Sequence, residues 1–172
     1  MSNPIIAFDI KNYGTVKAEL YPESAPLTVK NFLDLINAGF YSGLIFHRVI
    51  EGFMIHGGGM DVNMKEKDAA SIKGEFVANG CKTNVLKHKR GTLSMARTNN
   101  PDSASSQFFI MHKDAPHLDG AYAAFGCVTD DESLAVVDKI AATATGRRGY
   151  YDDVPREPVI IERAYVIDTK SN

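Results

Sequence analysis

The fold of this chain is best read from the stretch Leu44-Ile-Phe-His-Arg-Val-Ile-Glu-Gly-Phe-Met-Ile-His-Gly-Gly-Gly59. Two short apolar runs flank Glu51-Gly52, which predicts a tight β-hairpin in which glycine supplies the permissive backbone. One cation, Arg48, stands in this apolar surround. An isolated arginine on a strand usually covers apolar surface with its stem and keeps its head in water. Beside Phe53 and Met54, however, its fork of donors could complete a pocket for an uncharged substrate with one polar group.

Length and charge narrow the choice of architecture and partner. The chain has 172 residues, enough for one substantial core, and we expect a single domain over residues 1–172. A formal net charge of −2 gives no general attraction to nucleic acid or to anionic membranes. We therefore expect neither as a partner, and we interpret the basic stretches 87–90 and 147–148 as solvated loop charges.

The expected cellular location follows from three negative features. The first residues show no basic segment followed by a long apolar run, so no secretory signal is predicted. No apolar run approaches the ~20 residues that a membrane helix needs. Cys81 and Cys127 lie far apart without a CxxC motif, which is typical of free thiols in a reducing compartment. These features predict a cytoplasmic protein.

Alternating residues and short apolar runs between turn signals predict eight short strands. They are expected at about residues 6–10, 16–20, 45–50, 53–55, 92–97, 107–112, 123–128 and 159–167. Because side chains alternate across a strand, Gln107, Phe109 and Met111 should share one face, with Phe108 on the other. Eight mostly antiparallel strands are enough to close a barrel, but their spacing does not distinguish a barrel from a sandwich.

Two amphipathic helices accompany the strands. Ser24 is expected to cap the first helix, and Gly39 to end it. The second should follow the acidic residues 130–132, which suit a helix N-terminus. Residues 60–90 lack periodicity and predict a long surface excursion, while the glycines and prolines of residues 143–158 predict a loop.

Four sequence blocks together resemble the cyclophilins, a family of peptidyl-prolyl cis/trans isomerases. They are Phe46 to Gly59, Gly91-Thr-Leu-Ser-Met-Ala96, Ser105-Ser-Gln-Phe-Phe-Ile110, and Leu118-Asp-Gly120 followed by Phe125-Gly126. The resemblance runs from about Ile5 to Val166, and the loop at 143–158 is similar to an insertion in bacterial single-domain members. It implies a closed eight-stranded antiparallel β-barrel capped by an α-helix at each end.

The resemblance also implies residue roles. Arg48 corresponds to the catalytic arginine, which donates a hydrogen bond to the proline nitrogen in the twisted transition state. Gln107 would hold the substrate backbone, and Ala96 and Arg97 would pair with it as a strand. The residues implied in substrate binding are Phe53, Met54, His56, Ala96, Arg97, Gln107, Phe109, His117, Leu118 and Tyr122, of which Phe53, Met54, Phe109 and Leu118 form the proline pocket.

Four of these positions depart from the common family pattern. Arg97 stands where many relatives have asparagine, and Tyr122 where many have histidine. His56 replaces a glutamine that orients the arginine; imidazole could take over that bond, and its protonation would then matter between about pH 5 and 8. His117 stands where animal members have tryptophan, so binding of the cyclic peptide cyclosporin is expected to be weak.

The chemistry implied needs no cofactor and no metal. Accelerating Xaa-Pro rotation to the millisecond range takes about 7 kcal/mol off the barrier, which requires no nucleophile. The five histidines lack HExxH or paired Cys/His spacing, and no GxSxG motif supports nucleophilic catalysis. The expected partners are proline-containing peptides and folding proteins, bound by a monomer. The remaining alternative is a binding module that grips proline loops without turning them.

Overall fold

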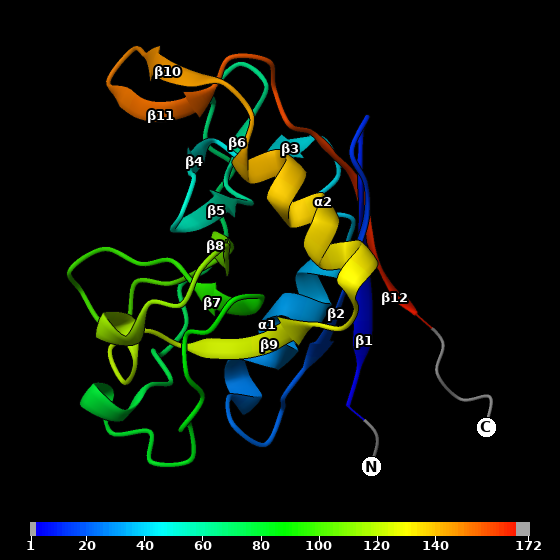
Figure 1. Cartoon of the computed structure of the whole chain (residues 1–172). Coiled ribbons are helices and arrows are strands. Elements are labelled where there is room, and N and C mark those ends of the chain that lie inside the picture. Colours follow the sequence, from blue (N-terminus) through cyan, green and yellow to red (C-terminus); the bar gives the residue numbers. More distant parts are fainter. Residues whose placement is uncertain (1–2, 168–172) are drawn as a thin grey trace.

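The structure, a computed structural model, describes residues 3–167 and is built around one antiparallel sheet of eight strands (Figure 1). All eight match strands expected from the sequence, and their order is β12-β1-β2-β9-β7-β8-β5-β4. Their bounds, in that order, are Ile161–Ile167, Ile5–Ile10, Gly14–Leu20, Ala124–Val128, Thr92–Met95, Phe108–Met111, Met54–Gly57 and Arg48–Ile50.

The sheet is a curled half-barrel rather than the closed barrel expected. Its edge strands β12 and β4 do not pair with each other within the described residues. Phe46 and His47 belong to no strand and separate β4 from the short strand β3 (Leu44–Ile45). It is β3, not β4, that lies beside the last strand. There Ile45 forms an isolated bridge with Ile160, while β3 itself pairs with β6 (Met60–Asp61). Alternating apolar residues cannot reveal this break between β3 and β4, because they are the same in an open and a closed sheet.

Residues 143–158 contain a β-hairpin, so the prediction of a loop there is wrong. Strands β10 (Thr145–Arg148) and β11 (Tyr151–Pro155) pair antiparallel and turn at Gly149, whose φ is 62°. Most of their residues are exposed or half-buried, so no alternation of apolar side chains marks them as strands. The hairpin lies beside β4, the strand that carries Arg48 (Figure 1).

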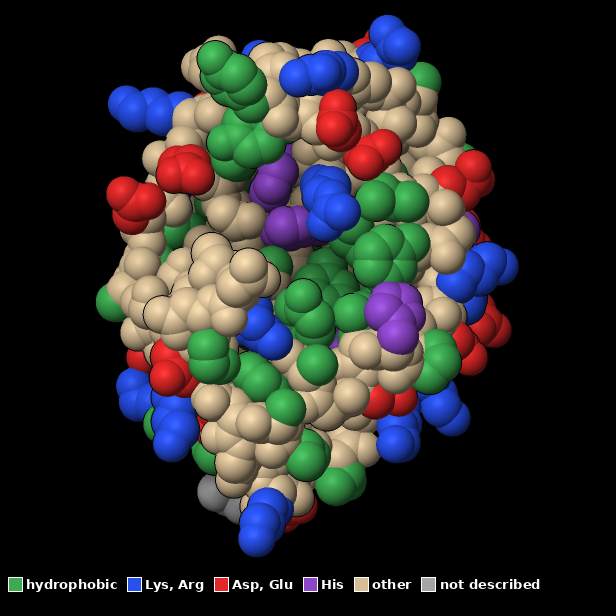
Figure 2. All heavy atoms as spheres, turned by 90° about the vertical axis from the view of Figure 1, so that its left-hand side faces the viewer, with side chains coloured by type: hydrophobic (Ala, Val, Ile, Leu, Met, Phe, Trp, Pro, Cys, Tyr) green, Lys and Arg blue, Asp and Glu red, His purple; other side chains and the backbone are tan. Residues whose placement is uncertain are grey.

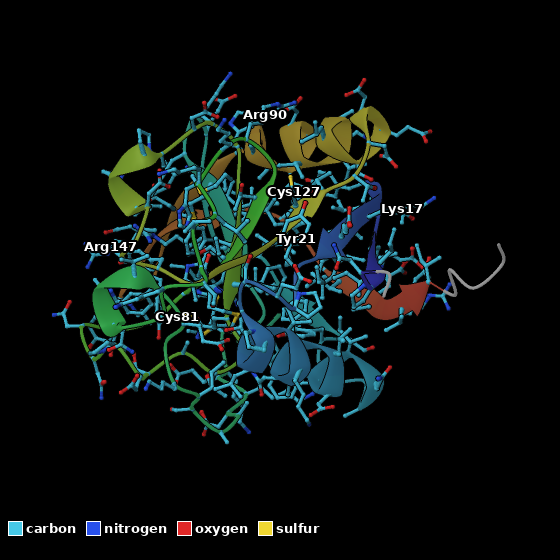
Figure 3. All side chains as sticks on the ribbon, turned by 90° about the horizontal axis from the view of Figure 1, so that it is seen from below. Lys17, Tyr21, Cys81, Arg90, Cys127 and Arg147 are labelled. Atoms are coloured by element: carbon cyan, nitrogen blue, oxygen red, sulfur yellow. The ribbon has the colours of Figure 1, made fainter. Side chains whose placement is uncertain are left out.

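In the described part of the chain four helical segments accompany the strands: α1 (Pro26–Asn37), α2 (Asp131–Ala141) and two single turns, η1 (Val77–Asn79) and η2 (Pro116–Leu118). Seen from below, α1 and α2 lie on opposite sides of the strands (Figure 3). The Asp130 side chain caps α2 by accepting a hydrogen bond from the Ser133 N–H. This agrees with the acidic start predicted for α2. No helix among residues 3–167 has the length and apolar character needed to cross a membrane.

The N-terminus of α1 is stabilised by a distant residue, so the prediction that Ser24 caps this helix is wrong. The N-cap position is Ala25, which has no side-chain cap. Instead, the buried Glu75 carboxylate accepts hydrogen bonds from the Thr28 N–H at 2.6 Å and the Leu27 N–H at 3.1 Å. Glu75 belongs to the surface excursion, which is therefore fastened to the core. At the other end Gly39 takes a left-handed φ of 71°, as expected for a residue that ends a helix.

Strands β5 and β8 separate two hydrophobic clusters. Phe108 and Ile110 face the main core, which also takes buried residues from both helices. Phe109 and Met111 face a smaller second cluster, built from Met54, Phe109, Met111, Ala115 and Leu118. The predicted alternation along β8 is confirmed. Both cysteines are free, and Figure 3 shows them well apart.

Candidate active site

The second cluster forms the wall of an open hollow of about 430 Å³, which we call the first hollow. Figure 2 shows it as a hydrophobic depression bordered by histidine and by Lys or Arg side chains. It is lined by Arg48, Phe53, Met54, His56, Ala96, Arg97, Phe109, Leu118 and Tyr122. All of these residues were candidates from the sequence. Gln107 lines a neighbouring hollow instead, and the exposed His117 stacks on Phe53 at the rim, with ring centroids 6.0 Å apart.

Arg48 is the cationic group at the mouth of the first hollow. It lies on β4 directly opposite His56 of β5, and its residue is exposed. Within residues 3–167 no hydrogen bond or ion pair holds the guanidinium. Its planar fork of N–H donors is therefore available to a bound ligand.

His56 is bonded to Gln107, not to Arg48. Its Nε2 lies 2.8 Å from the Gln107 Oε1, and because an amide oxygen only accepts, the imidazole donates from Nε2. The Gln107 amide N–H₂ is then left to donate to a ligand. From the sequence, His56 could have oriented the arginine; in the structure its imidazole bonds Gln107 instead.

Protonation of His56 between pH 5 and 8, considered above as a consequence of such a bond to the arginine, is not expected either. Burial lowers the pKa of His56 to about 3, with the neighbouring His47 as the next cause. The two rings lie 4.6 Å apart between centroids, and burial lowers the pKa of His47 to about 4. Both imidazoles are therefore neutral at physiological pH. Among the described residues no group of three or more histidine, cysteine or acidic side chains could hold a metal ion.

The turn that carries Phe53, part of the apolar wall, is held in place by hydrogen bonds to His112. The Gly52 N–H donates to His112 Nδ1 at 2.9 Å, and the His112 N–H donates to the Phe53 carbonyl at 2.8 Å. Since Nδ1 accepts, the proton of this imidazole is on Nε2, which lies 3.1 Å from Asp138 Oδ1. Asp138 is on α2, so the helix braces the turn. Sequence reasoning missed His112, because nothing local marks a strand-end histidine as a brace.

A buried Ser-His-Asp arrangement lies behind Phe109. His88 Nε2 is 2.8 Å from Ser94 Oγ, and His88 Nδ1 is 3.0 Å from Asp119 Oδ1. These distances are those of a nucleophilic triad, but Ser94 is 0% exposed and cannot reach a substrate. The His88 ring stacks on Phe109 with centroids 6.0 Å apart. We interpret the group as a structural support for Phe109.

Comparison with known proteins agrees with this geometry. Residues 5–166 match the family described as Cyclophilin type peptidyl-prolyl cis-trans isomerase/CLD. The chain therefore belongs to the cyclophilin-type peptidyl-prolyl cis-trans isomerases, which confirms the resemblance drawn from the sequence blocks.

Individual relatives cover most of the chain. Peptidyl-prolyl cis-trans isomerase B of Escherichia coli (strain K12) is 48% identical over 164 residues, which are 90% of this chain and 95% of the relative. A peptidyl-prolyl cis-trans isomerase of Acinetobacter baylyi is 49% identical over 156 residues, 87% of this chain and 79% of the relative.

Solved structures give the same family. A Cryptosporidium parvum cyclophilin type peptidyl-prolyl cis-trans isomerase superposes with a TM-score of 0.78 at 28% identity, covering 96% of this chain and 98% of the other. A further structure of that isomerase, in the presence of the dipeptide Ala-Pro, gives a TM-score of 0.75 at 29% identity. It covers 95% of this chain and 99% of the other.

Proposed function

We propose that this chain accelerates rotation about Xaa-Pro peptide bonds in polypeptides and so assists their folding, with Arg48 as the catalytic residue. The observation that carries the proposal is a guanidinium without a partner among residues 3–167, at the mouth of a largely apolar hollow. Two comparisons support the choice of substrate: the chain's family, and the relative whose structure was solved in the presence of the dipeptide Ala-Pro.

The proposed role of Arg48 follows from the electronic structure of the amide. In the planar ground state the proline nitrogen shares its lone pair with the carbonyl, which gives a rotation barrier near 20 kcal/mol. In the twisted transition state the nitrogen becomes pyramidal and can accept a hydrogen bond. A donor aimed at that nitrogen binds only the transition state, and such selective binding lowers the barrier.

The other residues would position the substrate. Phe53, Met54, Phe109 and Leu118 give the proline ring a dry seat, and the Gln107 amide, oriented by His56, can donate to the substrate backbone. The Ala96 N–H already donates to the Gln107 carbonyl at 3.0 Å. Strand pairing with the substrate would therefore use the Ala96 carbonyl and the Arg97 backbone.

The rival function is a module that binds proline-containing loops without turning them. Exchange NMR on a capped Ala-Pro peptide separates the two, because it measures isomerisation and binding on the same sample. We expect the native protein to accelerate exchange, and Arg48→Ala to lose most of that rate while still binding the peptide. Arg147→Ala, which removes an exposed arginine of β10, is the matched control and should leave the rate unchanged. A native protein that binds without accelerating exchange establishes the binding module.

Four further expectations remain predictions. We propose a single domain, a monomer, a cytoplasmic location and weak binding of cyclosporin. The last rests on His117, whose imidazole offers less apolar surface at the rim of the first hollow than an indole would. Titration with cyclosporin, comparing the native protein with His117→Trp, measures that contribution directly.

A further inference from the structure

A second hollow of about 420 Å³ adjoins the first and differs from it in chemistry. The two share His56, Ala96 and Arg97. The second hollow is lined, beyond these, by hydroxyl and amide side chains, namely Thr98, Ser103, Ser105 and Gln107. No carboxylate from the described residues lines either hollow. A side chain that enters the second hollow therefore meets donors and one fixed cation, Arg97.

The Arg97 guanidinium is held rigidly. Nη1 donates to the Thr98 carbonyl at 2.9 Å and Nη2 to the Ala121 carbonyl at 2.6 Å. The group also lies over two aromatic rings, 4.8 Å from the centroid of Phe76 and 4.6 Å from that of Tyr122. A guanidinium held in this way loses little side-chain entropy when it binds an anion.

The charge of Arg97 is not neutralised within residues 3–167. Its Nε is buried without a hydrogen-bond partner, and its two bonds to carbonyls use only two of its five N–H donors. Asp102, in the loop that borders the second hollow, accepts instead from the Gly74 N–H at 3.0 Å and from Asn79 Nδ2 at 2.9 Å. The unneutralised charge and the remaining Nη N–H groups, rather than the buried Nε, favour an acceptor brought by a ligand.

An extended substrate would reach both hollows at once. Residues two apart along a strand point to the same face and are separated by about 6.7 Å. A peptide whose proline ring occupies the first hollow therefore directs the side chain two residues away toward the neighbouring hollow. We propose that Arg97 makes the second hollow select an acidic side chain at that position, and that the enzyme prefers such substrates.

This inference rests on the proposed function. A shallow site would be expected to accept many Xaa-Pro sequences, and the inference narrows that range to substrates with an acidic side chain near the proline. An ion pair near the surface is screened by water and salt, so the preference should be modest, about two- to fivefold in kcat/KM. Binding energy used far from the reacting bond is shared by ground and transition states. The preference should therefore be seen mainly in KM.

The test uses capped peptides with one Ala-Pro bond and either Glu or Gln placed two residues before or two residues after the proline. Exchange NMR would give kcat/KM for the native protein, for Arg97→Gln, for Arg97→Lys and for the control Arg147→Gln, at low and high salt. We expect the native protein and Arg147→Gln to favour Glu at one of the two positions. High salt should weaken the preference, Arg97→Gln should abolish it, and Arg97→Lys should retain part of it.

Two outcomes would overturn the inference. One is equal rates for Glu and Gln peptides in the native protein. The other is an equal gain from Glu at both positions that survives in Arg97→Gln, which would indicate general attraction to the protein. Arg97→Lys keeps the test informative if Arg97→Gln does not fold. Failure of the proposed function is distinguishable, because then no peptide of the set isomerises faster with the protein present.

Discussion

The neutral state of His56 leads to a prediction that separates activity from stability as pH falls. The imidazole donates from Nε2 to Gln107 and has a pKa lowered to about 3 by burial. Between pH 7.5 and pH 5 its protonation state in the folded protein does not change. We therefore expect kcat/KM for a capped, uncharged peptide to stay constant over this range, as far as His56 determines it.

The free energy of unfolding should behave differently, because His56 binds a proton in the unfolded chain at a pH where the folded protein keeps it neutral. A histidine in the unfolded chain titrates near pH 6.5, whereas folded His56 stays neutral down to about pH 3. The stabilising contribution is therefore complete above pH 6.5 and is lost as pH falls toward 3. Each pH unit within that window costs about 1.4 kcal/mol of unfolding free energy per proton, so His56 accounts for about 2 kcal/mol by pH 5.

The matched variant is His56→Gln, which keeps a donor for Gln107 and cannot titrate. Urea denaturation at pH 7, 6 and 5 would give the unfolding free energy of both proteins. We expect the native protein to lose about 2 kcal/mol more than the variant between pH 7 and pH 5. Two results would refute the reasoning: equal losses in both proteins, or a native activity profile with a midpoint near pH 6.5 that His56→Gln removes.

Two further predictions concern single contacts. Glu75→Gln should lower the unfolding free energy by about 1–2 kcal/mol, because it weakens the cap on α1. Urea denaturation measures this loss against the exposed control Glu23→Gln. Equal stabilities of the two variants would contradict the prediction. Gly59→Ala should lower kcat/KM about ten- to hundredfold in a folded protein, because its Cβ would displace the Gln107 side chain. Unchanged exchange NMR rates in that variant would show that the placement of Gln107 is not needed.

The sequence could predict the elements whose burial is one-sided and local. Strand β2 alternates buried and less buried residues, whereas β7 and β8 are short runs buried at every residue. The turn at Gly52 takes the positive φ, 83°, that a glycine-containing hairpin permits. The face of β8 on which Phe109 lies also follows from the alternation of side chains along a strand. The first hollow could be assembled from the family resemblance, because its residues come from four motifs that keep their order along the chain.

The sequence could not predict contacts between residues far apart in it. Glu75 caps a helix that begins 49 residues earlier (75 − 26), and His112 braces Gly52 from another strand. The partner of His56 is of the same kind, since Gln107 belongs to a different motif. The hairpin β10–β11 was missed for another reason. Its exposed residues gain little from burial, so no periodic pattern is required of them.

The first hollow is a small hydrophobic cluster in which one position is open to solvent and can be filled by an apolar group of a ligand. Met54, Phe109 and Leu118 are at most 9% exposed and pack as a core does, yet the cluster opens to solvent beside Arg48. Seating the three methylenes of a proline ring there is worth roughly 2–3 kcal/mol. The ring is buried equally in the planar and the twisted amide, so this energy lowers KM and leaves kcat unchanged. In the proposed mechanism the cluster therefore binds proline, and the difference between the two states has to come from a directed donor, which Arg48 supplies.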